Sequence, residues 1–154
     1  MSEEAPDPLD RISAAVDIRM EVDVDASADV VWEVLTHFKA WPLWHRGVSF
    51  AVLRGELEPG TRLHWRADGM RIRSKLKEVE PERTLGFTLR AMGGWGYHRW
   101  TLVPLDDDRT LVRIEEVWAG FVVRLLRRTL HRTLEVSRAS WLEALRERVE
   151  GSPD

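Results

Sequence analysis

Six short segments with the pattern of β-strands follow one another through the middle of the chain. Turn-forming residues separate them, for example Glu58-Pro59-Gly60 and Met92-Gly93-Gly94, and no segment with a helical period intervenes. Consecutive strands about 10–13 residues apart, without a helix to cross the sheet, pair as an antiparallel meander. The predicted strands lie near residues 47–55, 60–68, 71–80, 84–91, 95–104 and 110–119.

Different patterns flank this meander. Residues 16–24 alternate apolar with charged side chains, which predicts a strand with one solvated face. An apolar stretch near 28–38 predicts a helix, and Pro42 restricts the next part, near 38–45, to a short helix or a turn. From Phe121 to Glu150 the apolar residues recur every three or four positions, which predicts one long amphipathic helix.

This order of elements predicts an α+β fold. The sheet and the last helix each have one apolar face to bury, so we expect a curved antiparallel sheet wrapped around the long C-terminal helix. A curved sheet held in this way often leaves an internal cavity beside the helix. We expect a single domain over residues 16–150, preceded by a flexible, solvated tail over residues 1–15.

The amino-acid composition excludes several classes of catalytic site, metal site and partner. The chain has no cysteine, which excludes thiol catalysis, cysteine-based zinc sites and iron–sulfur clusters. A formal net charge of -3 gives no overall attraction for nucleic acid. No apolar run reaches the roughly 18 residues of a membrane-spanning helix, and the acidic N-terminal residues do not resemble a signal peptide. We therefore expect a cytoplasmic protein with no cofactor, no metal site and no nucleic-acid partner.

Strand alternation selects the residues that face the helix. In the strands near 60–68, 71–80 and 84–91 one face is almost purely apolar and is expected to point inward, whereas the opposite face of the first two is basic. A flat ligand could stack on an inward indole or phenyl ring, although these rings are equally suited to filling the core. The candidate ligand contacts on these strands are Trp65, Ser74 and Phe87.

Ionisable residues occur on the inward face of the next two strands. His98 shares its face with Trp100, and Glu116 shares its face with Trp118. Burying either charge alone would cost several kcal/mol, so the two groups should pair or shift their pKa values. A carboxylate–imidazole pair in an apolar cavity suits general acid–base catalysis. The alternative is structural: Glu116 accepts hydrogen bonds that fix the strand, and His98 orients a ligand.

Further candidate ligand contacts extend this set. Trp100 and Trp118 have inward parity and serve either the core or a ligand. Tyr97 follows Gly93-Gly94 near a strand start, where a loop could gate the entrance. On the last helix the candidates are Leu130, which belongs to the apolar stripe, and Thr133 and Ser137, whose hydroxyl groups interrupt that stripe. The two hydroxyl groups could equally lie at the solvent edge.

Five segments occur in a specific order and spacing before the amphipathic helix: DASADVVWEVLTHFKAWPLW, GELEPGTRLHW, KLKEVEPERTLGF, HRWTLVP and TLVRIEEVWAG. Together they resemble the polyketide cyclase/dehydrase and lipid-transport family of the START-like (SRPBCC, helix-grip) superfamily, over about residues 16–149. The resemblance implies a deep cavity between the sheet and the C-terminal helix that holds an apolar or aromatic small molecule. It does not fix an activity, because the family includes cyclases, dehydratases, lipid carriers and receptors.

Two functions therefore stay open. A cofactor-independent cyclase or dehydratase would fold its substrate in the cavity, with His98 and Glu116 assisting proton transfer. A carrier or sensor of a lipid or other hydrophobic ligand needs no ionisable pair, so the pair favours the enzyme. The early part of the last helix is basic because it contains Arg124, Arg127, Arg128 and Arg132. These arginines either form a solvated face or contact an anionic membrane surface or an acidic carrier protein.

Overall fold

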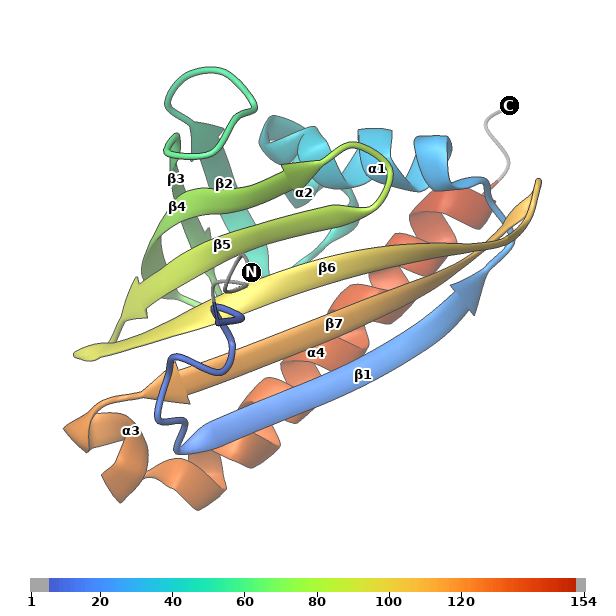
Figure 1. Ribbon diagram of the computed structural model, residues 1–154. Helices are drawn as coiled ribbons and strands as arrows, with labels where there is room; N and C mark the ends of the chain where they lie inside the picture. Colours follow the sequence, from blue (N-terminus) through green and yellow to red (C-terminus); the bar gives the residue numbers. More distant parts are fainter. Residues whose placement is uncertain (1–5, 152–154) are drawn as a thin grey trace, which may run out of the picture.

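A seven-stranded sheet curls around a long C-terminal helix in the computed structural model, which describes residues 6–151 (Figure 1). The long helix is α4 (Arg127–Glu150). The strands are β1 (Val16–Val24), β2 (Val48–Leu53), β3 (Arg62–Ala67), β4 (Met70–Glu80), β5 (Thr84–Ala91), β6 (Gly94–Asp106) and β7 (Arg109–Ala119). The predicted α+β architecture, with a sheet gripping the last helix, is confirmed.

The strand order is β1-β7-β6-β5-β4-β3-β2, and every neighbouring pair is antiparallel. Strands β2 to β7 therefore form the predicted meander, and β1 closes the sheet by pairing with β7. Because side chains alternate between the two faces of each strand, this register decides which residues meet inside. His98 of β6 lies directly opposite Glu116 of β7.

A short helical segment covers one end of the sheet between β1 and β2. It consists of α1 (Ala28–Thr36), a 3-10 turn η1 (Phe38–Ala40) and α2 (Trp41–Trp44). Pro42 lies in the first turn of α2, where its missing N–H costs no helical hydrogen bond. The indole N–H of Trp41 donates to the Leu35 carbonyl at 3.0 Å, which fixes this ring over the core.

The C-terminal helix is divided, contrary to the prediction of one helix over residues 121–150. A short helix, α3 (Phe121–Leu125), precedes α4, and Leu126 between them has non-helical backbone angles. The break changes the helix direction. Val123 can then pack against the end of the sheet, while the buried stripe of α4 starts further on, at Leu134. The described part of the chain contains no helix that is both long enough and apolar enough to span a membrane.

The segment before β1 is not solvated throughout, which corrects the prediction for part of the tail. Leu9 is buried against Tyr97 and Val117 on the outer face of the sheet. The Asp7 carboxylate accepts hydrogen bonds from the guanidinium of Arg99, the shorter at 2.7 Å. The physical reason is that Tyr97 and Val117 are apolar on an outward face and need a cover. Residues 1–5 of the predicted tail lie outside the described residues.

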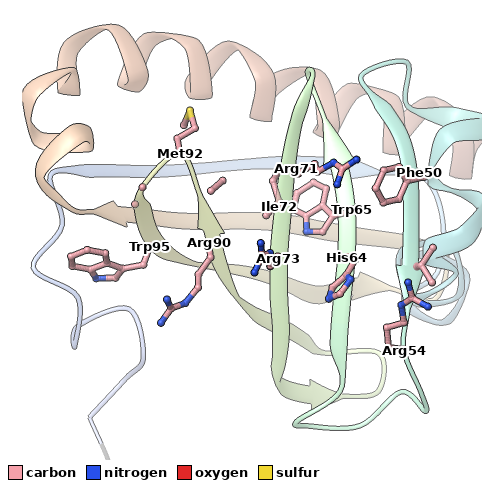
Figure 2. A pocket seen from close by; sticks show the side chains of 14 residues that line it. Phe50, Arg54, His64, Trp65, Arg71, Ile72, Arg73, Arg90, Met92 and Trp95 are labelled. Atoms are coloured by element: carbon pink, nitrogen blue, oxygen red, sulfur yellow. The ribbon is translucent and has the colours of Figure 1, made fainter.

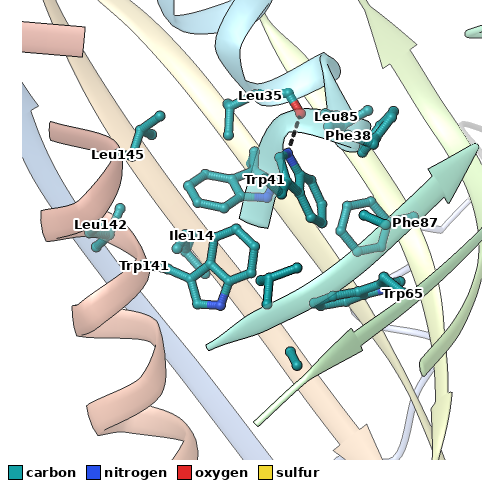
Figure 3. Close-up of a cluster of buried hydrophobic side chains, with 14 of the residues drawn as sticks. Leu35, Phe38, Trp41, Trp65, Leu85, Phe87, Ile114, Trp141, Leu142 and Leu145 are labelled. Atoms are coloured by element: carbon teal, nitrogen blue, oxygen red, sulfur yellow. Dashed lines mark hydrogen bonds between the residues drawn. The ribbon is translucent and has the colours of Figure 1, made fainter. Parts of the chain in front are cut away.

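The indole rings of Trp41, Trp65 and Trp141 pack together between the sheet and α4, among leucine, isoleucine and phenylalanine side chains (Figure 3). Trp41 and Trp141 lie 5.0 Å apart between ring centroids, and Trp65 lies 5.5 Å from Trp41, both edge to face. Beside them remains an interior void of ≈ 10 Å³, about the volume that one water molecule needs. The deep cavity that the family resemblance implies is thus largely occupied by the protein's own buried side chains, tryptophans among them.

Candidate functional site

A buried histidine and a buried glutamate are bonded to each other on the inner face of the sheet. His98 Nδ1 lies 2.6 Å from Glu116 Oε1, and the two residues are only 3% and 0% exposed. Their positions follow from the register of β6 and β7, which places them directly opposite each other. The strand-parity prediction that both side chains point inward is therefore confirmed.

Arg138 of α4 is a third member of this cluster, and sequence reasoning missed it. Its Nε donates to Glu116 Oε1 at 2.9 Å, and its side chain is buried. Its sequence position carried a signal, because it lies four residues after Leu134 and three before Trp141, on the apolar stripe of the helix. An arginine on such a stripe needs a buried anion as its partner, and here that anion is the carboxylate of Glu116.

Both oxygens of Glu116 are used. While Oε1 receives His98 and Arg138, Oε2 accepts the indole N–H of Trp118 at 2.9 Å. Three elements therefore hold one carboxylate: β6, β7 and α4. We call His98, Glu116 and Arg138 the buried cluster.

The electrostatics of the buried cluster define its protonation. Burial alone would raise the pKa of Glu116, but the charge of Arg138 and the hydrogen bonds from His98 and Arg138 outweigh it and hold that pKa well below its usual value. Burial lowers the pKa of His98, and the neighbouring carboxylate compensates only in part. Glu116 is thus ionised and His98 neutral, and the charges of Glu116 and Arg138 cancel.

This protonation fixes the tautomer of His98. Nδ1 carries the proton that is donated to Glu116, so Nε2 has a free lone pair. Within residues 6–151, Nε2 has no hydrogen-bond partner although it is buried, and the same holds for the indole N–H of Trp100 and Trp141. All three residues line the interior void. The residues that carry these three unpaired atoms therefore line the void, although the wall that the void itself exposes is apolar.

A larger hollow lies outside, where the sheet is split between β4 and β5 (Figure 2). The pairing of these strands runs as far as Arg73–Arg90, and no pair follows it toward Met70. The resulting cleft has a volume of ≈ 780 Å³ and is bordered by β2, β3, β4 and the turn between β5 and β6. Trp65 lines both this cleft and the interior void, so its indole forms the wall between them.

Several predicted ligand contacts lie around the void. Trp65, Phe87 and Trp100 line it together with His98. Ser74 and Trp118 are buried next to it, but each is already bonded: Ser74 Oγ accepts the Trp65 indole N–H at 3.0 Å, and Trp118 donates to Glu116. Whether a ligand touches any of them stays a prediction.

Other predicted contacts lie elsewhere. Tyr97 is on the outer face of β6, because it directly precedes His98 in the strand, and its hydroxyl donates to Glu78 at 2.5 Å. Thr133 is exposed on α4, Leu130 is half-buried at the core edge, and Ser137 is half-buried and donates to Asp68. The expected gating position of Tyr97 is thereby corrected, whereas Thr133 takes the solvent-edge position that the sequence left open.

Solved structures similar to this chain share its fold. A START superfamily protein from Mycobacterium smegmatis is 17% identical with a TM-score of 0.76, over 87% of this chain and 97% of that one. The Zhui aromatase/cyclase from a Streptomyces species is 20% identical with a TM-score of 0.74, over 87% and 93% of the two chains. A norcoclaurine synthase point mutant from Thalictrum flavum, in complex with a transition-state analogue, is 19% identical with a TM-score of 0.67, over 86% and 92%.

Sequence comparison gives the family. No curated protein matches the chain. The model of the family described as polyketide cyclase/dehydrase and lipid transport matches residues 15–150, which include every strand, the buried cluster and the walls of the cleft. The chain therefore belongs to the polyketide cyclase/dehydrase and lipid-transport family, and its fold is the helix grip of the START superfamily.

Proposed function

We propose that the protein binds a hydrophobic small molecule between the cleft and the buried cluster, with Trp65 at the boundary. Family membership supports a ligand of this kind. The cleft volume of ≈ 780 Å³ lies within the range of about 300–1,000 Å³ that small-molecule sites occupy. The interior void is too small for such a ligand, so a molecule that reaches His98 has to displace the Trp65 indole.

The finer proposal is that His98 acts as a general base on the bound molecule, as in a cofactor-independent cyclase or dehydratase. One observation carries it: His98 Nε2 is a buried lone pair without a partner in the described structure, while Nδ1 is fixed to an ionised carboxylate. Nε2 would take a proton from an acidic C–H or O–H group, and Glu116 would stabilise the imidazolium. Arg138 keeps Glu116 ionised, so that Glu116 does not compete for this proton.

The unpaired indole donors complete this chemistry. When a proton leaves the carbon next to a carbonyl, negative charge develops on the carbonyl oxygen, and the N–H groups of Trp100 and Trp141 are the donors available to stabilise it. In a dehydration the imidazolium would return its proton to the departing hydroxyl, which leaves as water. Cyclase and dehydratase steps thus need no group beyond these side chains.

The alternative is a carrier or sensor that leaves its ligand unchanged. In that case Nε2 of His98 and the two indole N–H groups would only hydrogen-bond the polar end of the ligand. Native mass spectrometry of the purified protein tests this alternative directly, because a carrier should retain an apolar molecule of unchanged structure.

Kemp elimination of 5-nitrobenzisoxazole tests the base, since this probe reports any accessible base in an apolar pocket. The base removes the ring C–H, the N–O bond breaks, and the coloured phenolate is measured by absorbance. We expect turnover by the natural chain and its loss in His98→Gln. The matched control is His131→Gln, an exposed histidine on α4, which should keep full activity. Binding of the probe without turnover, or full activity in His98→Gln, would favour the carrier.

A second proposal concerns an anionic membrane surface, and the exposed apolar residues around α3 favour it. Phe121 and Leu125 are 80% and 71% exposed. Exposed arginines at Arg124, Arg127 and Arg128 are interspersed with them, and the sequence has no acidic residue between Glu116 and Glu135. Apolar side chains among cations are the pattern of a segment that lies on an anionic bilayer.

Vesicle co-sedimentation tests this second proposal. The protein should sediment with vesicles of phosphatidylcholine and phosphatidylserine more than with phosphatidylcholine alone. Leu125→Ser combined with Arg127→Gln should abolish the difference, whereas Arg83→Gln, on a distant turn, should not. Equal sedimentation with both vesicle types would contradict the proposal.

A further inference from the structure

Cations face one another across the strands next to the cleft. The register places Arg66 opposite Arg71, and Arg73 opposite Arg90. Like charges at directly opposite positions destabilise a sheet. None of these arginines forms an ion pair with any residue from 6 to 151.

The rest of the sheet is built differently. On the outer face of β1, β6 and β7 the arginines have carboxylate partners, for example Arg19 with Glu115 and Arg113 with Glu21. Arg99 bonds both Asp7 and Glu78. The chain has Asp+Glu 26 against Lys+Arg 23, so carboxylates are not scarce. Among the arginines of the strands, those without a carboxylate partner in the described structure therefore lie on β3, β4 and β5.

These unpaired arginines surround a hollow with an apolar floor. Arg71, Arg73 and Arg90 line the cleft, and its buried floor includes Trp65 and Ile72 (Figure 2). No acidic residue of the described chain lines it. The volume of the cleft suits a small molecule rather than a polymer. Because the floor is apolar and the border is basic, a matching ligand combines an apolar part with an anionic group.

We propose that the cleft binds an amphiphilic anion. Its apolar body would lie on Trp65 and Ile72, and its carboxylate or phosphate would lie among Arg71, Arg73 and Arg90. The planar guanidinium offers paired N–H donors that match either oxyanion. The anion also removes the repulsion between Arg73 and Arg90, so binding strengthens the split strand pair. This inference rests on the proposed function, which is the binding of a hydrophobic small molecule, and it specifies in addition that the ligand carries a negative charge.

Isothermal titration calorimetry with three probes of one chain length tests the inference. The probes are dodecanoate, dodecyl phosphate and the uncharged glycerol monoester of dodecanoic acid, each below its micelle concentration. At low salt we expect at least one anion to bind roughly tenfold or more tightly than the ester, because charge-assisted hydrogen bonds add to the shared apolar contact. The advantage should shrink as salt rises. The tighter anion identifies the headgroup as carboxylate or phosphate.

Matched variants locate the anion. Arg73→Gln with Arg90→Gln should lower the affinity for the anions to that for the ester and leave the ester unchanged. Arg83→Gln is the control, since Arg83 is exposed on the turn at the other end of the β4–β5 hairpin and lies outside the cleft. Because the paired substitution removes a repulsion, the variant should stay folded, which circular dichroism verifies.

The outcomes separate this inference from the proposed function. Equal affinity for ester and anions, or undiminished anion binding by the Arg73→Gln, Arg90→Gln variant, would overturn the amphiphilic anion and leave a hydrophobic ligand in place. Failure of all three probes to bind the natural chain would overturn both.

Discussion

Arg138 decides the protonation of the buried cluster. Without its charge, Glu116 would be a buried carboxylate with only an imidazole and an indole as partners. Such a group takes up a proton rather than remain charged. His98 would then lose the anion that orients its Nδ1 proton. The arginine thus acts on His98 through Glu116, as a positioning residue.

Arg138→Met should therefore destabilise the fold at neutral pH by about 3–5 kcal/mol, since Glu116 must then either stay buried without a cation or take up a proton at a pH far above the usual pKa of a carboxyl group. Chemical denaturation measures the loss. Adding Glu116→Gln to Arg138→Met should restore much of the stability, because the stranded charge disappears with its partner. If the double variant is as unstable as the sum of both single variants, the two side chains are not coupled.

The pH dependence of stability follows from the same residues. In the folded protein the pKa of His98 is lowered, so the unfolded chain takes up this proton first as the pH falls below about 6.5. The pKa of Glu116 is also lowered, so its contribution is present above about 4.5 and is lost at lower pH. The lowered pKa values of His98 and of Glu116 therefore both predict that the protein is less stable in acid.

Denaturation at pH 7 and pH 5 should therefore show a lower unfolding free energy at pH 5. His98→Asn should reduce the difference, and so should His45→Asn, because burial lowers the pKa of His45 in the same direction. His37→Asn, on an exposed site, is the control. A difference that is identical in His98→Asn and the natural chain would contradict the neutral state of His98.

At the scale of elements, the β4–β5 pair of the sheet is interrupted at more than one position. Its register shifts between Leu76 and Glu78, the side chain of Thr88 accepts the Lys75 backbone N–H, and the pair ends at two opposed arginines. The pairing of β4 with β5 therefore stops at Arg73 and Arg90, where the cleft lies.

Arg90→Gln alone should raise the free energy of unfolding by about 0.2–1 kcal/mol, the size of a cross-strand pair. Thermal unfolding in low salt measures the gain, and high salt should reduce it because screening already weakens the repulsion. Arg83→Gln should show neither effect. A loss of stability in Arg90→Gln would mean that this arginine makes a stabilising contact instead.

Strand elements were the predictable part of the site. Alternation alone placed His98, Trp100, Glu116 and Trp118 on the inner face, because a strand fixes the direction of every second side chain. Tyr97 was misplaced because it was assigned by closeness to a loop; alternation would have put it on the outer face, opposite to its neighbour His98. Arg138 was missed since arginine on a helix ordinarily points to solvent. The break at Leu126 depends on how Val123 packs, which no local pattern encodes.

At the scale of the whole molecule, the interior is closed by its own aromatic rings. Whether an indole lies in or beside a cavity depends on rotamers and on packing between distant elements, so the sequence predicted the inward tryptophans but left open whether they fill the core or contact a ligand. Trp65 of β3 lines both the cleft and the void, and in the function that we propose it is the ring on which access depends.

Trp65→Ala should join the cleft and the void. The lost packing should cost about 3–5 kcal/mol of stability, as for other buried tryptophans. Kemp elimination by His98 should become faster, because the probe then reaches Nε2 without displacing an indole. Trp95→Ala is the control: this ring is exposed at the cleft but does not line the void. A slower elimination in Trp65→Ala would place the access route elsewhere.

The clustered indoles also give the molecule an optical property. Trp41, Trp65 and Trp141 lie 5.0–6.0 Å from one another, and Trp100 lies 6.2 Å from Trp141. Chromophores this close share their excitation, so they absorb and emit as a coupled group. Moving one ring would change the near-ultraviolet circular dichroism and the fluorescence of all four. Binding of a ligand in the interior can therefore be followed by the near-ultraviolet circular dichroism and fluorescence of these tryptophans, without an added label.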